Sequence, residues 1–168
     1  MNTKRIARHM LMSGGQLRRA FPRSALNTIE VAIKASEATH GGQVRFAVEA
    51  SLDGVPLFNG QSARERALEV FSQLRVWDTE HNNGLLIYLL LADRAVEIVA
   101  DRSIHLKVAS HEWNQVCKQM ESAFKQGDFE GGVLGGVKAV TQYLAKHFPV
   151  KGGSGNELSD KPVVLSST

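Results

Sequence analysis

The residues whose types and spacing suggest chemistry gather between positions 75 and 102. Asp78, Glu80 and Asn82 offer oxygen ligands at alternating positions, the spacing of the first ligands in an EF-hand loop. Hard cations such as Ca²⁺ and Mg²⁺ prefer oxygen ligands. The pattern then departs from an EF-hand, because Gly84 falls one position late and Leu89 stands where the bidentate Glu belongs. The other interpretation of this segment is a turn before a strand, with solvated acids.

Asp101 joins these candidate metal ligands through the expected topology. An antiparallel pairing of residues 84–92 with residues 95–101 would place the end of the second strand beside the start of the first. Arg102 follows Asp101 directly, and together with Arg75 it could hold an anion or a phosphate group. The alternative for these charges is a surface ion pair.

Other reactive side chains predict no site. His81, His105 and His111 lack the spacing of metal ligands, and Cys117 falls on the apolar stripe of a helix. A single cysteine excludes an internal disulfide. The chain has no P-loop, dinucleotide fingerprint or nucleophile elbow.

The elements that must position the candidate residues follow from hydrophobic periodicity. Residues 43–50 and 95–101 alternate, which predicts strands, and 43–50 is expected to have one wetter face. The apolar run 84–92 predicts a buried central strand. Helical spacing predicts helices over 24–40, 62–74, 110–126 and 129–148. The last of these carries glycine pairs at positions 131–132 and 135–136, and small residues allow a helix to approach its neighbour closely.

This order predicts a three-layer α/β/α sandwich on a small mixed sheet. The first two strands, joined through a helix, should be parallel with a right-handed crossover, and the third should complete an antiparallel hairpin. We expect a basic N-terminal arm, helical in part, over residues 1–23 and one α/β domain over 24–148. Residues 149–168 are rich in Gly and Ser, and we expect them to form a disordered tail.

Charge is distributed unevenly along the chain. Residues 1–23 carry six Lys and Arg residues and no acid, so the arm is +6 while the whole chain is only +3. Such an arm suits an acidic surface, most simply that of a protein partner, whereas the alternative is a solvated helix face. Aromatic residues do not interleave the cations before Phe21, so a base-stacking nucleic-acid platform is not indicated. We find no signal-peptide pattern and no apolar run long enough to span a membrane, and we expect a cytoplasmic protein.

Several motifs resemble those of the TPM domain family. Asn82-Asn83-Gly84 followed by the apolar strand 85–91 is similar to the family's NNG-plus-strand signature. Asp93-Arg94 followed by Val96 and Ile98 is similar to its D-R-x-V-x-I hairpin. The pattern of Trp113, Phe124, Gly127, Phe129, Gly131 and Gly132 resembles its C-terminal helix pair. The likeness spans about residues 24–148.

The resemblance implies the fold described above and three functions found in different members: a phosphatase-like activity, calcium binding and photosystem repair. Glu37 resembles an acid that the family tends to keep. Gln43, however, stands where members often have Glu after a glycine, and Asp101-Arg102-Ser103 replaces the usual Gly-x-Gly turn. These departures favour a noncatalytic protein-interaction or binding module that uses the basic arm or the cleft beside Asp101. The alternative is a divalent-metal-dependent phosphatase-like hydrolase, with Asp78, Glu80 and Asp101 on the ion and Arg102 on phosphate.

Overall fold

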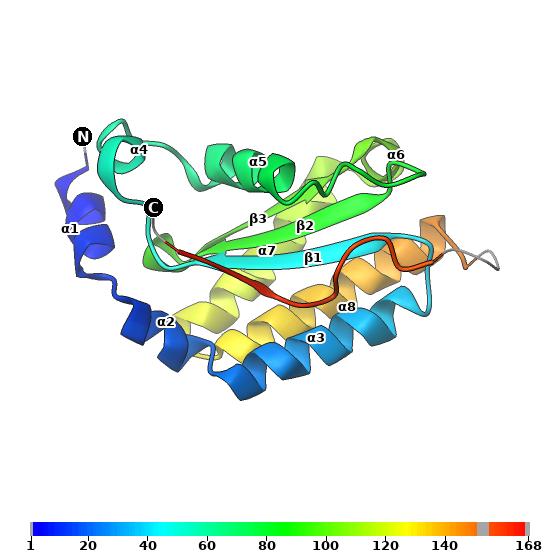
Figure 1. The fold of residues 1–168 in the computed structure, drawn as a ribbon, viewed down its shortest axis with the longest axis horizontal. Coiled ribbons are helices and arrows are strands. Elements are labelled where there is room, and N and C mark those ends of the chain that lie inside the picture. The colour runs from blue at the N-terminus through cyan, green and yellow to red at the C-terminus, as the bar shows by residue number, and fades with distance from the viewer. Residues whose placement is uncertain (1, 151–154, 167–168) are drawn as a thin grey trace.

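A computed structural model describes residues 2–150 and 155–166. Its centre is a four-stranded mixed sheet in the order β3-β2-β1-β4 (Figure 1). β1 (Gln43–Glu49) runs parallel to β2 (Gly84–Leu90) and to β4 (Val163–Leu165), whereas β2 pairs antiparallel with β3 (Ala95–Ala100). The predicted parallel pair, hairpin and α/β class are confirmed.

Helices cover both faces of the sheet, which gives the three predicted layers (Figure 1). One face packs against α3 (Arg23–Glu37), α7 (Ser110–Lys125) and α8 (Phe129–His147). The other packs against α4 (Gly54–Phe58) and α5 (Ala63–Gln73). The short η1 (Leu91–Asp93) joins β2 to β3, and the single turn α6 (Arg102–His105) leads from β3 into α7.

The buried strand β2 divides its side chains between two cores. Leu85, Ile87 and Leu89 face the α3–α7–α8 layer, while Leu86, Tyr88 and Leu90 face α5. This alternation follows from the two-residue period of a strand whose two faces are both covered.

The glycines of α8 explain how closely α7 and α8 approach. A Cβ at Gly132 would lie 2.5 Å from the Phe124 ring, and one at Gly136 would lie 2.3 Å from the Met120 sulfur. Both Phe124 and Met120 belong to the apolar stripe of α7 and are buried. The glycines therefore cost helix propensity but admit the neighbouring helix, as the sequence predicted.

The second face of β1 is not the wetter face that alternation predicted. Gln43, Ala47 and Glu49 on that face are all buried. The polar members remain there because each has a partner: Arg66 of α5 binds Glu49, and residues 157–158 bind Gln43. Alternation of polar and apolar residues signals exposure only when no partner is available to satisfy the polar groups.

The predicted disordered tail is contradicted over residues 155–166. Val163–Leu165 forms β4, which extends the sheet by pairing with Ala47–Glu49 of β1. Leu158, Val163 and Leu165 pack against the α5-side core. Glycine- and serine-rich composition suggested disorder, but three apolar residues and an open sheet edge are enough to order the segment. Residues 151–154 and 167–168 of the predicted tail lie outside the described residues.

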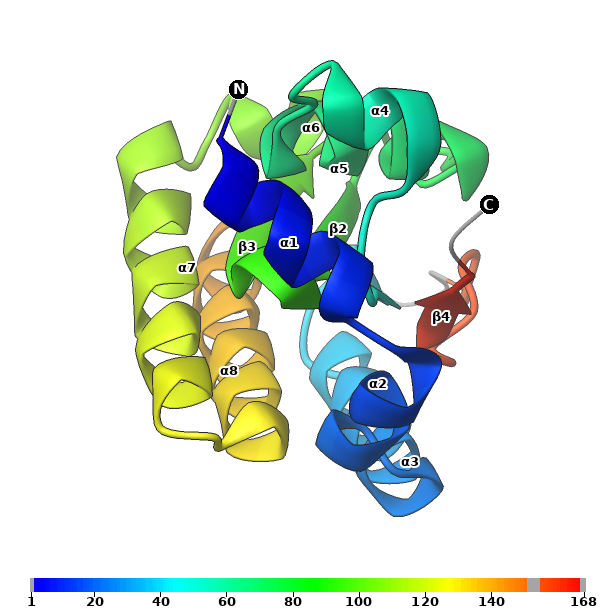
Figure 2. The same ribbon diagram turned by 90° about the vertical axis from the view of Figure 1, so that its left-hand side faces the viewer.

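The basic arm folds onto the domain as two helices, α1 (Thr3–Leu11) and α2 (Gly14–Ala20), and Figure 2 shows α1 crossing the end of the sheet. Leu17 and Phe21 are buried in the main core. In the described part of the chain, no helix is both long and apolar enough to cross a membrane.

Candidate functional site

The loop predicted to bind a metal forms structural contacts of its own. The guanidinium of Arg75 binds the Asp78 carboxylate at 2.6 Å and lies over the exposed Trp77 ring. Glu80 contributes its backbone N–H, which donates to the carboxylate of Glu157 at 2.8 Å. Arg75 and Asp78 thus form a surface ion pair, and the Glu80 backbone contacts the C-terminal segment through Glu157.

Asp101 lies next to Asn82, as the hairpin topology predicted. Its N–H donates to the Gly84 carbonyl at 2.8 Å, and the N–H of Ser103 donates to the Asn82 carbonyl at 3.0 Å. One carboxylate oxygen of Asp101, Oδ1, accepts from the backbone N–H of Arg102, whose side chain is exposed. The other oxygen, Oδ2, is buried and has no hydrogen-bond partner among the described residues. Asn82 adopts a left-handed conformation with φ of 50°, which asparagine tolerates better than most residues.

Within residues 2–150 and 155–166, no group of three or more His, Cys, Asp or Glu side chains is arranged to hold a metal ion. Asp78 and Asp101 both lie near the start of β2, but their carboxylates serve different local partners.

The C-terminal segment docks over the start of β1. The side-chain oxygen of Gln43 accepts from the backbone N–H groups of Glu157 and Leu158, at 2.8 and 3.0 Å. Arg45 donates to the Ser159 carbonyl. Since a neutral amide both donates and accepts, Gln43 suits this docking role.

Glu37, at the end of α3, faces the same segment. Burial is the main cause that raises the pKa of the Glu37 carboxyl to about 8, and a hydrogen bond with Asp160 acts in the same direction. The Val44 N–H, which donates to this carboxyl, acts in the opposite direction. The carboxyl is therefore mostly protonated at neutral pH, and its O–H can donate a hydrogen bond to Asp160. Ionisation would set two carboxylates against each other beneath β4.

Raising the pH from ~6.5 to ~8.5 is expected to weaken the fold through Glu37. The folded-state pKa of about 8 lies above the value of 4.5 for an exposed glutamate in the unfolded chain, so the native state binds the extra proton in this window and loses stability as pH rises. Allowing for partial solvent screening, the loss is on the order of 1 kcal/mol. Urea unfolding across this window measures it, and Glu37→Gln should flatten the dependence.

His40 provides the control for that experiment. Burial lowers the pKa of His40 from 6.5 to about 4. The titration of His40 therefore raises the free energy of unfolding with increasing pH only below about 6.5. His40 therefore does not act in the window where Glu37 titrates. A slope that persists unchanged in Glu37→Gln would contradict the assignment.

The cations of the arm converge on a single acid. Arg5 and Arg8 bind the Asp93 carboxylate at 2.8 and 3.0 Å, and His9 Nε2 lies 3.1 Å from it. The other ring nitrogen of His9 accepts from the Leu52 N–H. Two of the six cations of the arm thus fasten α1 to η1, while Lys4, Arg18, Arg19 and Arg23 remain exposed.

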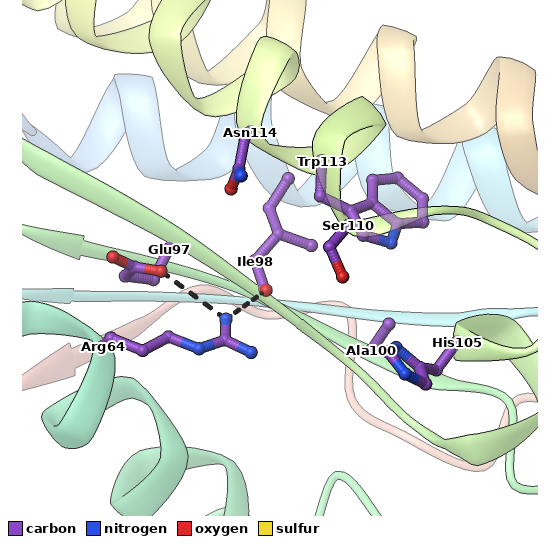
Figure 3. Close-up of a pocket in the computed structure, with 8 residues that line it drawn as sticks. All are labelled: Arg64, Glu97, Ile98, Ala100, His105, Ser110, Trp113 and Asn114. Atoms are coloured by element: carbon purple, nitrogen blue, oxygen red, sulfur yellow. Dashed lines mark hydrogen bonds and ion pairs between the residues drawn. The ribbon is translucent and has the colours of Figure 1, made fainter.

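A pocket of about 410 Å³ opens at the outer edge of β3, between α5, α6 and α7 (Figure 3). Its polar lining comes from Arg64, Glu97, His105, Ser110, Trp113 and Asn114, and Ile98 and Ala100 supply its apolar floor. Arg64 donates from Nη1 to the Ile98 carbonyl at 2.7 Å and lies 3.5 Å from the Glu97 carboxylate.

Sequence reasoning missed this pocket. Its residues come from four elements and span positions 64 to 114, so no local spacing signals them. Trp113 was assigned to the helix stripe, which is correct for its ring: the residue is buried and packs edge-on against Tyr143. The available clue was its indole N–H, because a buried tryptophan requires a hydrogen-bond acceptor.

Comparison with known proteins was made on sequence and on structure. A family model described as the TPM domain matches residues 18–143. No curated protein matches the chain. The NMR structure of BA42 from the psychrophilic bacterium Bizionia argentinensis superposes with a TM-score of 0.74 at 27% identity, covering 84% of this chain and 93% of that one.

Two further NMR structures share the fold. The N-terminal domain of a protein from P. gingivalis gives a TM-score of 0.54 at 24% identity, over 84% of this chain and 83% of that one. The N-terminal domain of the cg2496 protein from Corynebacterium glutamicum gives 0.53 at 16%, over 84% and 78%. The family match covers most of the chain and includes the NNG strand, the hairpin and the start of α8, so this chain belongs to the TPM domain family.

Proposed function

We propose that this TPM domain is a noncatalytic binding module that receives its ligand in the pocket at the β3 edge. The observation that carries the proposal is the pocket itself. Its volume of about 410 Å³ lies within the range typical of small-molecule sites, roughly 300–1,000 Å³. Like such sites, it combines an apolar floor with a few convergent polar groups.

The nearby reactive groups favour binding over turnover. Cys117, on the α7 face behind β3, is buried, and burial raises the pKa of its thiol to about 12. The thiol is therefore protonated at neutral pH and is a poor nucleophile. Glu97 is engaged by Arg64, and burial raises the pKa of its carboxyl. These features describe a site that holds a ligand between fixed groups.

The second candidate is the divalent-metal-dependent phosphatase-like hydrolase. The observation in its favour is Asp101 Oδ2, a buried oxygen without a partner among the described residues, next to the Asn82 loop. A cation would satisfy that oxygen, with Asn82, Glu80 or Asp78 as further ligands and Arg102 or Arg75 near a phosphate group.

One experiment separates the two candidates. Hydrolysis of p-nitrophenyl phosphate is followed with Ca²⁺, Mg²⁺, Mn²⁺ or EDTA, and thermal melts are recorded under the same conditions. We expect no turnover above buffer and the same Tm with each ion as with EDTA. An ion bound only by the folded state at about 100 times its Kd would add about 2.7 kcal/mol, a shift of several degrees.

Asp101→Asn serves as the matched variant, because its amide oxygen can still accept from the Arg102 N–H, while the charge is lost and an NH₂ group replaces the other oxygen. Turnover or an ion-induced Tm shift that appears in the wild type and disappears in Asp101→Asn would replace the binding-module proposal with the hydrolase.

A further inference from the structure

The indole N–H of Trp113 is a buried donor without an acceptor. Trp113 is 5% exposed, and its Nε1 has no hydrogen-bond partner among the described residues. A buried unpaired donor costs about 1–3 kcal/mol. In Figure 3 the indole nitrogen lies on the ring edge that faces the space between Ser110 and His105, inside the pocket. A ligand oxygen placed there would satisfy it.

Arg64 brings positive charge to the same pocket from the opposite side. Its hydrogen bonds within the described residues both use Nη1, which leaves the Nε and Nη2 donors for a ligand. Its side chain is half exposed at the pocket mouth. A guanidinium presents its donors in a fixed fork that matches the paired oxygens of a carboxylate or phosphate.

The N-terminus of α7 adds to the positive potential. Ser110, the first residue of this 16-residue helix, lines the pocket. The Glu112 carboxylate accepts from the Ala109 N–H before the helix begins, and the first helical N–H groups have no intrahelical partner. The positive end of the helix dipole therefore lies at the pocket wall, where the Glu112 carboxylate offsets part of it.

The acidic side chain of the pocket lining, Glu97, is already paired with Arg64. Its carboxylate lies beside the Nη1 end of Arg64. The volume exceeds that of a bare inorganic anion, and Ile98 with Ala100 provides an apolar wall for a larger molecule.

We propose that the pocket binds a small organic anion, either a carboxylate or a phosphate ester. Its charged oxygens accept from Trp113 Nε1 and from the free nitrogens of Arg64, and its apolar part lies against Ile98 and Ala100. This inference rests on the proposed binding function and adds the chemical class of the ligand.

The test uses ¹⁵N-labelled full chain titrated with phenyl phosphate, benzoate or neutral benzyl alcohol. Both indole N–H signals can be followed in one spectrum: Trp113 reports the pocket, while Trp77, which is 48% exposed and outside the pocket lining, is the internal control. We expect a saturable Trp113 shift with at least one anion and binding about tenfold tighter than that of benzyl alcohol. A response to phenyl phosphate alone assigns a phosphate ester, and a response to benzoate alone assigns a carboxylate.

Arg64→Gln should weaken anion binding about tenfold, while Arg102→Gln, at an exposed arginine outside the pocket lining, should leave it unchanged. Trp113→Phe keeps an aromatic ring against Tyr143 and removes the N–H together with part of the indole ring. We expect a similar loss by calorimetry, and a wild-type-like backbone spectrum confirms that this variant is folded.

Three outcomes would overturn the inference. Benzyl alcohol binding as tightly as the anions would show that the pocket takes neutral ligands, and the binding-module proposal would stand. An anion effect lost in Arg102→Gln but kept in Arg64→Gln would place the anion at α6. The absence of a Trp113 shift with any of the three compounds at millimolar concentration would show that the pocket is not an anion site. Failure of the binding-module proposal is detected separately, by ion-dependent turnover in the hydrolysis assay.

Discussion

Replacing Arg66 with leucine is expected to lower the free energy of unfolding by about 3–5 kcal/mol. Arg66 binds both oxygens of the Glu49 carboxylate, at 2.9 and 3.0 Å, and Glu49 is only 2% exposed. The Tyr88 hydroxyl donates to the same carboxylate at 2.6 Å, and burial raises the pKa of Tyr88, which keeps it protonated. Without Arg66, a buried carboxylate would retain only that one neutral partner. Urea unfolding measures the loss.

Glu69→Ala is the control for this variant. Glu69 also binds Arg66 at 2.9 Å, but its side chain is 48% exposed, so its removal should cost less than ~1 kcal/mol. Replacing the whole buried group, Glu49→Leu with Arg66→Leu and Tyr88→Phe, should recover most of the stability, because no buried charge is left unpaired. A single Arg66→Leu variant as stable as Glu69→Ala would show that the pair is not buried in solution.

Replacing Gly84 with alanine is the second change expected to have a large effect. A Cβ at this position would lie 2.0 Å from the Val76 carbonyl oxygen and 3.0 Å from the Val76 carbonyl carbon. The obstruction is backbone, so the loop before β2 must move. We expect a loss of ~3 kcal/mol or more in the free energy of unfolding, at the upper end of overpacking costs.

Gly135→Ala provides the matched comparison, since a Cβ there meets no atom within 4 Å. Gly135 is exposed on α8, so alanine should stabilise the protein by about 0.5–1 kcal/mol through helix propensity. Thermal melts of the two variants should therefore shift in opposite directions. Equal shifts would contradict the close approach of Val76 to β2.

These two predictions also show what could be inferred from sequence. The Asn82-Asn83-Gly84 motif predicted a turn before a buried strand, and the turn and strand are present. The motif did not reveal why glycine is required, because the Val76 carbonyl approaches only after α5 has packed. Periodicity predicts which face of an element is covered, but close backbone contacts between elements depend on the fold.

Polar pairs across long sequence separations were the main source of error. Glu49 lies on the face of β1 predicted to be wetter, and only the placement of Arg66 on α5 makes its burial tolerable. Asp93 lies in the connection of the predicted hairpin, but the motif did not reveal that Arg5 and Arg8 of the arm converge on it. In each case the partner lies at least 17 residues away, beyond the reach of a local pattern.

The candidate site was predictable only in part. Hairpin topology correctly brought Asp101 beside the Asn82 loop, since antiparallel pairing determines which strand ends meet. The sequence did not reveal the contacts that these residues make: Asp78 pairs with Arg75, and Asp101 caps α6. The β3-edge pocket arises from the packing of α5 and α7 around an edge strand, which no single segment encodes.

The most direct test of the account is a pair of crystal structures of the chain, one grown with phenyl phosphate and Ca²⁺ and one grown with benzoate. The account predicts at least one of the two anions intact in the β3-edge pocket, with its charged oxygens within hydrogen-bond distance of Trp113 Nε1 and the Arg64 guanidinium. Inorganic phosphate or phenyl phosphate bound with Ca²⁺ at Asp78 and Asp101, with the pocket empty in both crystals, would contradict it and favour the hydrolase.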